Sequence, residues 1–107
     1  MPGYDIIPYN DLISLEEKLK NHNTAAFMIE PIQGEAGVIV PDEGYLSSVR
    51  SLCSKYNVLL IIDEVQTGLG RTGKMLASDY EKVRADILIL GKALSGGVLP
   101  SSAVLAN

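Results

Sequence analysis

A lysine and an aspartate each follow a short apolar run, in positions where they could act together in amine chemistry. Lys92 comes one glycine after the run Ile87–Leu90, and Asp63 directly ends the run Val58–Ile62. A deprotonated lysine amine forms a Schiff base with a carbonyl carbon, and a carboxylate can keep a pyridine nitrogen protonated. An enzyme that uses pyridoxal phosphate requires both groups, and we predict this cofactor.

The apolar runs predict the strands that position these residues. The predicted strands span 25–29, 58–62, 87–90 and 102–106, and the predicted helices span 10–21, 43–56 and, more briefly, 80–83. Asn10 or Asp11 is expected to cap the first helix, and Asp42 the second. This alternation indicates an α/β fold with a mostly parallel sheet.

A third polar group, Glu30, closes the strand predicted at 25–29. Ligands of open parallel sheets bind beyond the carboxyl ends of the strands, where Glu30, Asp63 and Lys92 would converge. Every strand must end in something polar, and for one residue alone that plain explanation is the stronger one. The three residues together favour a functional site at this edge of the sheet.

The glycine-rich segment 68–74 imitates a phosphate-binding P-loop. It fits the first seven positions of that motif, but Met75 stands where a metal-binding Ser or Thr is required. The acidic strand that would complete a nucleotide hydrolase directly precedes the same loop. The two elements therefore cannot reach one nucleotide from separate strands, and a nucleotide hydrolase is disfavoured.

Composition limits the classes of partner. The chain has 107 residues, a net charge of −4 and no basic block, so nucleic acid and anionic membrane surfaces are poor partners. The single cysteine, Cys53, excludes an internal disulfide and lies on the apolar face of a predicted helix, so we expect it in the core. The single histidine, His22, leaves no cluster of metal ligands.

The two ends of the chain predict that it is part of a longer protein. It opens on a loop-like segment rich in proline and glycine, and it closes on the predicted strand 102–106. We therefore expect residues 1–107 to be one incomplete domain. The first five residues show no basic region leading into an apolar one, and no targeting segment is predicted in this chain.

Four motifs in the chain resemble those of the class III pyridoxal-phosphate aminotransferases. They are Glu30 to Gly37, Asp63 to Gly68, Gly70 to Gly73 and Gly91 to Gly97, and they match in order and spacing. The resemblance implies the central part of a large domain of the fold-type-I class. It also implies that the last strand runs antiparallel to its neighbour, which a short connection permits.

The resemblance implies a role for five residues. Lys92 would be the Schiff-base lysine, and Asp63 would pair with the pyridine nitrogen. Gln66 would bond the phenolic oxygen of the cofactor ring. Glu35 would gate the substrate by changing partners. Glu30 would support the residues of the site without contacting the cofactor itself.

Within the family, the segment Glu35-Ala36-Gly37 is most similar to members that act on ornithine. They transfer its terminal amino group to 2-oxoglutarate, giving glutamate 5-semialdehyde and glutamate. Members that act on acetylornithine or 4-aminobutyrate, a related aminomutase, and an isolated inactive piece remain alternatives. The phosphate-binding loop and the carboxylate-binding arginine would lie outside this chain. The parent would be a homodimer or higher homo-oligomer, in the cytoplasm or the mitochondrial matrix.

Overall fold

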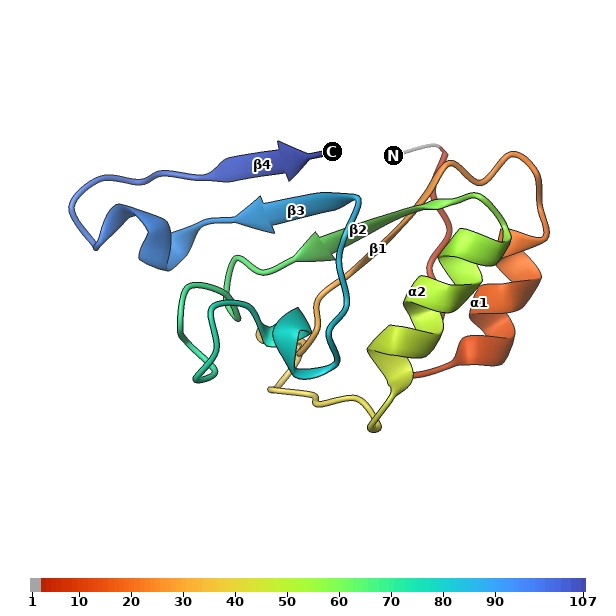
Figure 1. Cartoon of the computed structure of the whole chain (residues 1–107), viewed down its shortest axis with the longest axis horizontal. Helices are drawn as coiled ribbons and strands as arrows, with labels where there is room; N and C mark the ends of the chain where they lie inside the picture. Colours follow the sequence, from red (N-terminus) through yellow and green to blue (C-terminus); the bar gives the residue numbers. More distant parts are fainter. Residues whose placement is uncertain (1–2) are drawn as a thin grey trace.

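Four strands form a single sheet in the computed structural model, which describes residues 3–107 (Figure 1). They are β1 (Ala26–Ile29), β2 (Leu59–Asp63), β3 (Ile87–Leu90) and β4 (Ala103–Ala106), and they lie in that order across the sheet. The first three strands are parallel, and β4 pairs antiparallel with β3. The predicted α/β fold and the reversed last strand are confirmed, and each strand lies within one residue of its predicted range.

Helix α1 (Leu12–Leu19) is two residues shorter at each end than the predicted range. Asp11 caps it, because its Oδ1 accepts hydrogen bonds from the backbone N–H groups of Ile13 and Ser14, each at 3.0 Å. Asp11, and not Asn10, is therefore the cap.

Within residues 3–107, no helix is both long enough and apolar enough to span a membrane.

Helix α2 (Tyr45–Lys55) does not use the predicted cap. It begins after Gly44, whose left-handed backbone has φ 82° and which gives no side-chain cap. The N–H of Ser47, in the first turn, instead donates a hydrogen bond to the Glu81 carboxylate at 2.8 Å. A carboxylate from a remote segment thus caps the helix in place of Asp42.

The short helix predicted at 80–83 is wrong in position. The structure has a 3-10 helix, η1 (Ala77–Tyr80), and Lys82 has a left-handed backbone with φ 55° that ends the helical run. The backbone N–H groups of Ala77 and Ser78 donate to the buried carboxylate of Glu64. That contact fixes the turn earlier in the chain than local propensity indicates.

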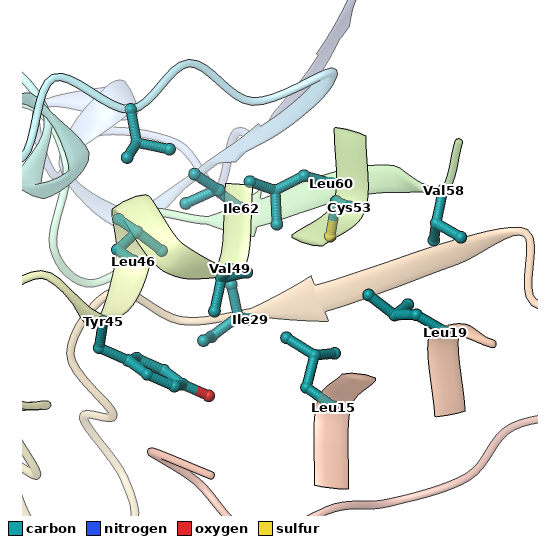
Figure 2. Close-up of a cluster of buried hydrophobic side chains, with 11 residues drawn as sticks. Leu15, Leu19, Ile29, Tyr45, Leu46, Val49, Cys53, Val58, Leu60 and Ile62 are labelled. Carbon is teal, nitrogen blue, oxygen red and sulfur yellow. The ribbon is translucent and has the colours of Figure 1, made fainter. Parts of the chain in front are cut away.

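Helices α1 and α2 cover one face of the sheet, and the apolar core lies between them and the strands (Figures 1 and 2). Figure 2 shows side chains from both helices meeting Ile29 of β1 and Leu60 and Ile62 of β2. Cys53 is among them and fully buried, so its predicted place in the core is confirmed.

The other face of the sheet is open. Successive side chains of a strand point to opposite faces, so the burial of Leu60 and Ile62 under the helices turns Leu59 and Asp63 to the far side. Leu59 is 48% exposed there, and Met28 of β1 is 55% exposed. Asp63 therefore faces an uncovered surface at the carboxyl end of β2.

Candidate active site

The carboxyl ends of the three parallel strands meet at one edge of the sheet, on the left of Figure 1. Glu30 follows β1, Asp63 is the last residue of β2, and Lys92 lies two residues after β3. Strand pairing places Asp63 beside Ile89, three residues before Lys92. The predicted convergence of these groups on one edge is thus present in the structure.

Three of the predicted site residues are in contact through their side chains. The Gln66 Nε2 donates a hydrogen bond to Glu35 Oε1 at 2.7 Å, and the Lys92 Nζ lies 3.8 Å from the same oxygen. Glu35 and Lys92 are 88% and 55% exposed, so both side chains have room to change partners. A carboxylate, an amide and an amine therefore share one point beyond the strand ends.

The backbone around Lys92 is unusual for a lysine. Lys92 opens the 3-10 helix η2 (Lys92–Ser95) with φ 43°, a left-handed conformation that disfavours residues with a side chain. Gly91 lies so close to Val65 that an added Cβ would meet the Val65 Cγ1 at 3.2 Å. A strained backbone at a lysine, next to a closely packed glycine, is typical of functional sites.

The carboxylate of Asp63 is held by the chain that follows it. Its Oδ1 accepts the N–H of Val65 at 2.9 Å. Within residues 3–107, no Lys, Arg or His side chain forms an ion pair with Asp63. Asp63 is half-buried and directed at the open face, so a cationic N–H donor from a ligand would complete its hydrogen bonding.

Glu30 acts on the loop that presents Glu35. Its Oε2 accepts the N–H of Gly34 at 3.1 Å. Gly34 in turn lies against Gln66, since an added Cβ at Gly34 would fall 2.5 Å from the Gln66 Oε1. Glu30 thus touches the site through the backbone, which fits the supporting position predicted for it.

Two residues for which the sequence predicted no role hold this edge together. The Tyr9 hydroxyl donates to the carbonyl oxygens of both Glu30 and Pro31 at 3.0 Å, and burial is the main cause that raises the pKa of Tyr9 to about 12. The other is Glu64, which is 1% exposed. Strand alternation could have placed Glu64 opposite Asp63, on the side covered by protein, where a carboxylate needs several donors.

One hollow on the surface, of about 270 Å³, is lined by Leu69, Gly70, Arg71 and Ala93, the last of which follows Lys92 in the chain. A wider one of about 430 Å³ lies between α1 and α2. None of the five predicted site residues lines either hollow. The P-loop-like segment is an irregular loop without a following α-helix, and Lys74 lies over the Tyr80 ring at 4.4 Å.

The donor set fits the cofactor that the sequence predicts. A carboxylate can accept a ring N–H, an amide N–H can donate to a ring oxygen, and an amine can attack an aldehyde. Asp63, Gln66 and Lys92 supply these groups from one edge of the sheet. Fold and site together define an α/β domain that presents a lysine amine at the carboxyl edge of its sheet.

The chain belongs to the class-III aminotransferase family, because the model of that family matches residues 7–107. The mitochondrial ornithine aminotransferase of Drosophila melanogaster is 68% identical over all 107 residues, which cover 100% of this chain and 25% of that protein. This chain thus spans about a quarter of the length of the curated relatives that it matches.

Solved structures give the same fold. An ornithine aminotransferase from Toxoplasma gondii, in which partial occupancy of PLP at the active site was found, has a TM-score of 0.97 and 57% identity. The match covers 99% of this chain and 25% of that one. An acetylornithine aminotransferase from Elizabethkingia anophelis has a TM-score of 0.96 and 63% identity, over 99% of this chain and 27% of its own.

Proposed function

We propose that the whole protein binds pyridoxal phosphate at this edge and transfers the terminal amino group of ornithine to 2-oxoglutarate. The products are glutamate 5-semialdehyde and glutamate. The observation that carries this proposal is the meeting of Lys92, Gln66 and Glu35 around one carboxylate oxygen, beside the strand that ends in Asp63.

Each residue has a defined part in this proposal. The Lys92 amine would attach the cofactor covalently and, when released, would carry a proton to and from the substrate carbon. The Asp63 carboxylate keeps the ring nitrogen protonated, and the Gln66 amide donates to the ring oxygen. The bound cofactor supplies an electron sink for the charge that develops on the substrate carbon.

Glu35 is proposed as the gate for the substrate. Its carboxylate is the most exposed group of the site, and it already has two alternative partners within reach. A mobile carboxylate can neutralise a cationic group in one state and release it in another. Glu30 would support the gate from behind by holding Gly34.

The identity of the amine donor needs a direct test. The acetylornithine aminotransferase structure is 63% identical to this chain and the Toxoplasma gondii ornithine aminotransferase is 57% identical. Overall identity of this segment therefore does not separate the two donors. Acetylornithine is the second candidate, and only the ornithine reaction yields a semialdehyde with a free α-amino group.

The experiment is an assay of the full-length protein with pyridoxal phosphate, 2-oxoglutarate and one donor at a time: ornithine, acetylornithine or 4-aminobutyrate. We expect kcat/KM for ornithine to exceed the others by about 100-fold or more, because acetylornithine carries an added acetyl group and 4-aminobutyrate lacks the α-amino group. A preference for acetylornithine would overturn the ornithine assignment and leave the transaminase assignment intact.

A second measurement tests the lysine. Borohydride reduction of the loaded protein should fix the cofactor to the peptide that contains Lys92, as read by mass spectrometry. Lys92→Ala should abolish both labelling and transamination. Lys74→Ala is the matched control, because Lys74 is an exposed lysine of the preceding loop whose amine contacts η1. Label on another lysine would refute the assignment.

We also propose that the whole protein is mitochondrial and a homo-oligomer. The Drosophila melanogaster relative is named as mitochondrial, which supports the first part. The second part follows from the family resemblance alone. Fractionation of cells and light scattering of the purified protein test the two parts separately.

A further inference from the structure

The buried carboxylate of Glu64 is saturated by hydrogen bonds. Its Oε2 accepts the Thr67 hydroxyl at 2.5 Å and the Ala77 N–H at 2.9 Å. Its Oε1 accepts the Ser78 N–H at 2.8 Å and the Ser78 hydroxyl at 2.9 Å. All four donors come from the segment 67–78, so this one side chain closes the long loop onto η1.

No charge compensates this carboxylate. Within residues 3–107, Glu64 has no ion pair, although it is only 1% exposed. A buried carboxylate is costly unless every acceptor position is used, and the bonds it makes are the stronger charge-assisted kind. The four donors must therefore hold their positions closely, and the loop that carries them is fixed as a result.

The backbone of Glu64 is anchored just as tightly. Its N–H donates to the carbonyl of Ile89 in β3 at 2.9 Å, and its carbonyl accepts the N–H of Gly68 at 2.9 Å. An added Cβ at Gly68 would lie 2.8 Å from that carbonyl and 3.2 Å from Leu90. Glu64 thus ties the end of β2, the strand that leads to Lys92, and the loop together.

We infer that Glu64 is a positioning residue for the cofactor site. This inference rests on the function proposed above. Glu64 lies in the chain between Asp63 and Gln66, and its carboxylate bonds Thr67, Ala77 and Ser78. Its carboxylate fixes the backbone from which Asp63 reaches the ring nitrogen and Gln66 reaches the ring oxygen. The site depends on this buried anion without touching it.

A merely structural role would produce a different result. A residue that only stabilises the fold should lower stability and leave the cofactor's affinity and absorbance unchanged. Asp86 provides the comparison, because its carboxylate also bonds a backbone N–H and a side chain, and it lies at the opposite, amino end of β3. Asp86→Asn is therefore the matched control for a carboxylate-to-amide change away from the site.

The experiment uses the full-length protein and the variants Glu64→Gln, Thr67→Val and Asp86→Asn. Three quantities are measured: the urea midpoint, the dissociation constant for pyridoxal phosphate, and the pH midpoint of the bound cofactor's visible absorbance. Glu64→Gln and Thr67→Val should each weaken cofactor binding about tenfold, the effect of losing one hydrogen bond to a charged group. Both should also move the absorbance midpoint, while Asp86→Asn lowers only the urea midpoint.

The outcomes separate the two proposals. If wild-type protein binds no pyridoxal phosphate, the proposed function fails and the positioning role falls with it. If wild-type binds but the Glu64 and Thr67 variants match Asp86→Asn in affinity and absorbance, the positioning role alone is overturned. Thr67→Val removes only one donor and decides the question should Glu64→Gln fail to fold.

Discussion

The side-chain amide of Gln66 donates to the carboxylate of Glu35 across 2.7 Å, joining two loops that are 31 residues apart in the chain. The Lys92 amine lies 3.8 Å from the same oxygen. A residue proposed to hold the cofactor and one proposed to gate the substrate thus share a contact. Any change in the position of Glu35 also alters the partners of Gln66 and Lys92. The gating and the cofactor binding that we propose would therefore be coupled.

Replacement of Asp63 tests the proposed role of its charge. Asp63→Asn keeps the size of the side chain but cannot hold a proton on a ring nitrogen. We expect the full-length variant to bind pyridoxal phosphate and to lose about 100-fold or more in kcat, the loss typical when a preorganised electrostatic partner is removed.

Steady-state kinetics and a cofactor titration check this result. Asp42→Asn is the control, because Asp42 is an exposed acid before α2 and takes no part in the site. Turnover at the wild-type rate in the Asp63 variant would count against the pairing.

The strands and their convergence were predictable from the sequence for a physical reason. Short runs of branched apolar residues such as Val58–Ile62 suit buried parallel strands, and parallel strands bring their carboxyl ends to one edge. The position of Asp63, Glu30 and Lys92 at that edge follows from topology alone. The contact between Gln66 and Glu35 does not, because it depends on the path of two irregular loops.

The errors arise where distant residues replace local signals. Asp42 is a good cap by type, but Glu81 bonds the N–H of Ser47 from 34 residues away. The short helix after the glycine-rich loop is displaced because Glu64 bonds the N–H groups of Ala77 and Ser78, more than ten residues further on. Long-range hydrogen bonds of this kind leave no periodic trace in a sequence.

The ion pair of Asp86 and Arg50 predicts a pH-dependent stability. The backbone N–H of Leu60 and then the Arg50 guanidinium hold the pKa of Asp86 below its ordinary value. A carboxyl whose pKa is lower in the folded state stabilises above its unfolded pKa, about 3.9, and this stabilisation is lost as the pH falls through the folded pKa.

Asp86→Asn should therefore lower the free energy of unfolding by about 1 kcal/mol at pH 7, a modest value because the group is partly exposed. Urea unfolding of the full-length protein at pH 7 and near pH 3 measures the difference. The gap between variant and wild type should shrink at the lower pH. A gap that stayed constant would exclude the charged form of Asp86 as its origin.

Cys53 should be inert in the folded protein. It is fully buried between the helices and the sheet, and burial is the main cause that raises its pKa to about 11. Only about one thiol in a thousand is ionised at pH 8 with such a pKa, and the thiolate is the reactive form. Iodoacetamide at pH 8 should leave the Cys53 peptide unmodified in native protein and label it in urea, as read by mass spectrometry. Fast labelling without urea would show that α2 opens readily from the sheet.

The contact between Gly34 and Gln66 gives the sharpest test of the site's geometry. A Cβ at position 34 would lie 2.5 Å from the Gln66 Oε1 and 2.7 Å from its Cδ, closer than real side chains approach. Gly34 has no left-handed backbone, so Gly34→Ala adds a steric effect without backbone strain. The alanine should push the Gln66 amide away from Glu35 and weaken pyridoxal phosphate binding about tenfold, as expected when one hydrogen bond to a charged group is lost.

The double variant Gly34→Ala, Gln66→Ala supplies the control, because truncated Gln66 leaves nothing to displace. In that background, Gly34→Ala should change the dissociation constant by less than about twofold, which is additivity within measurement. Equal losses in both backgrounds would show that Gly34 acts on the site by a route other than Gln66.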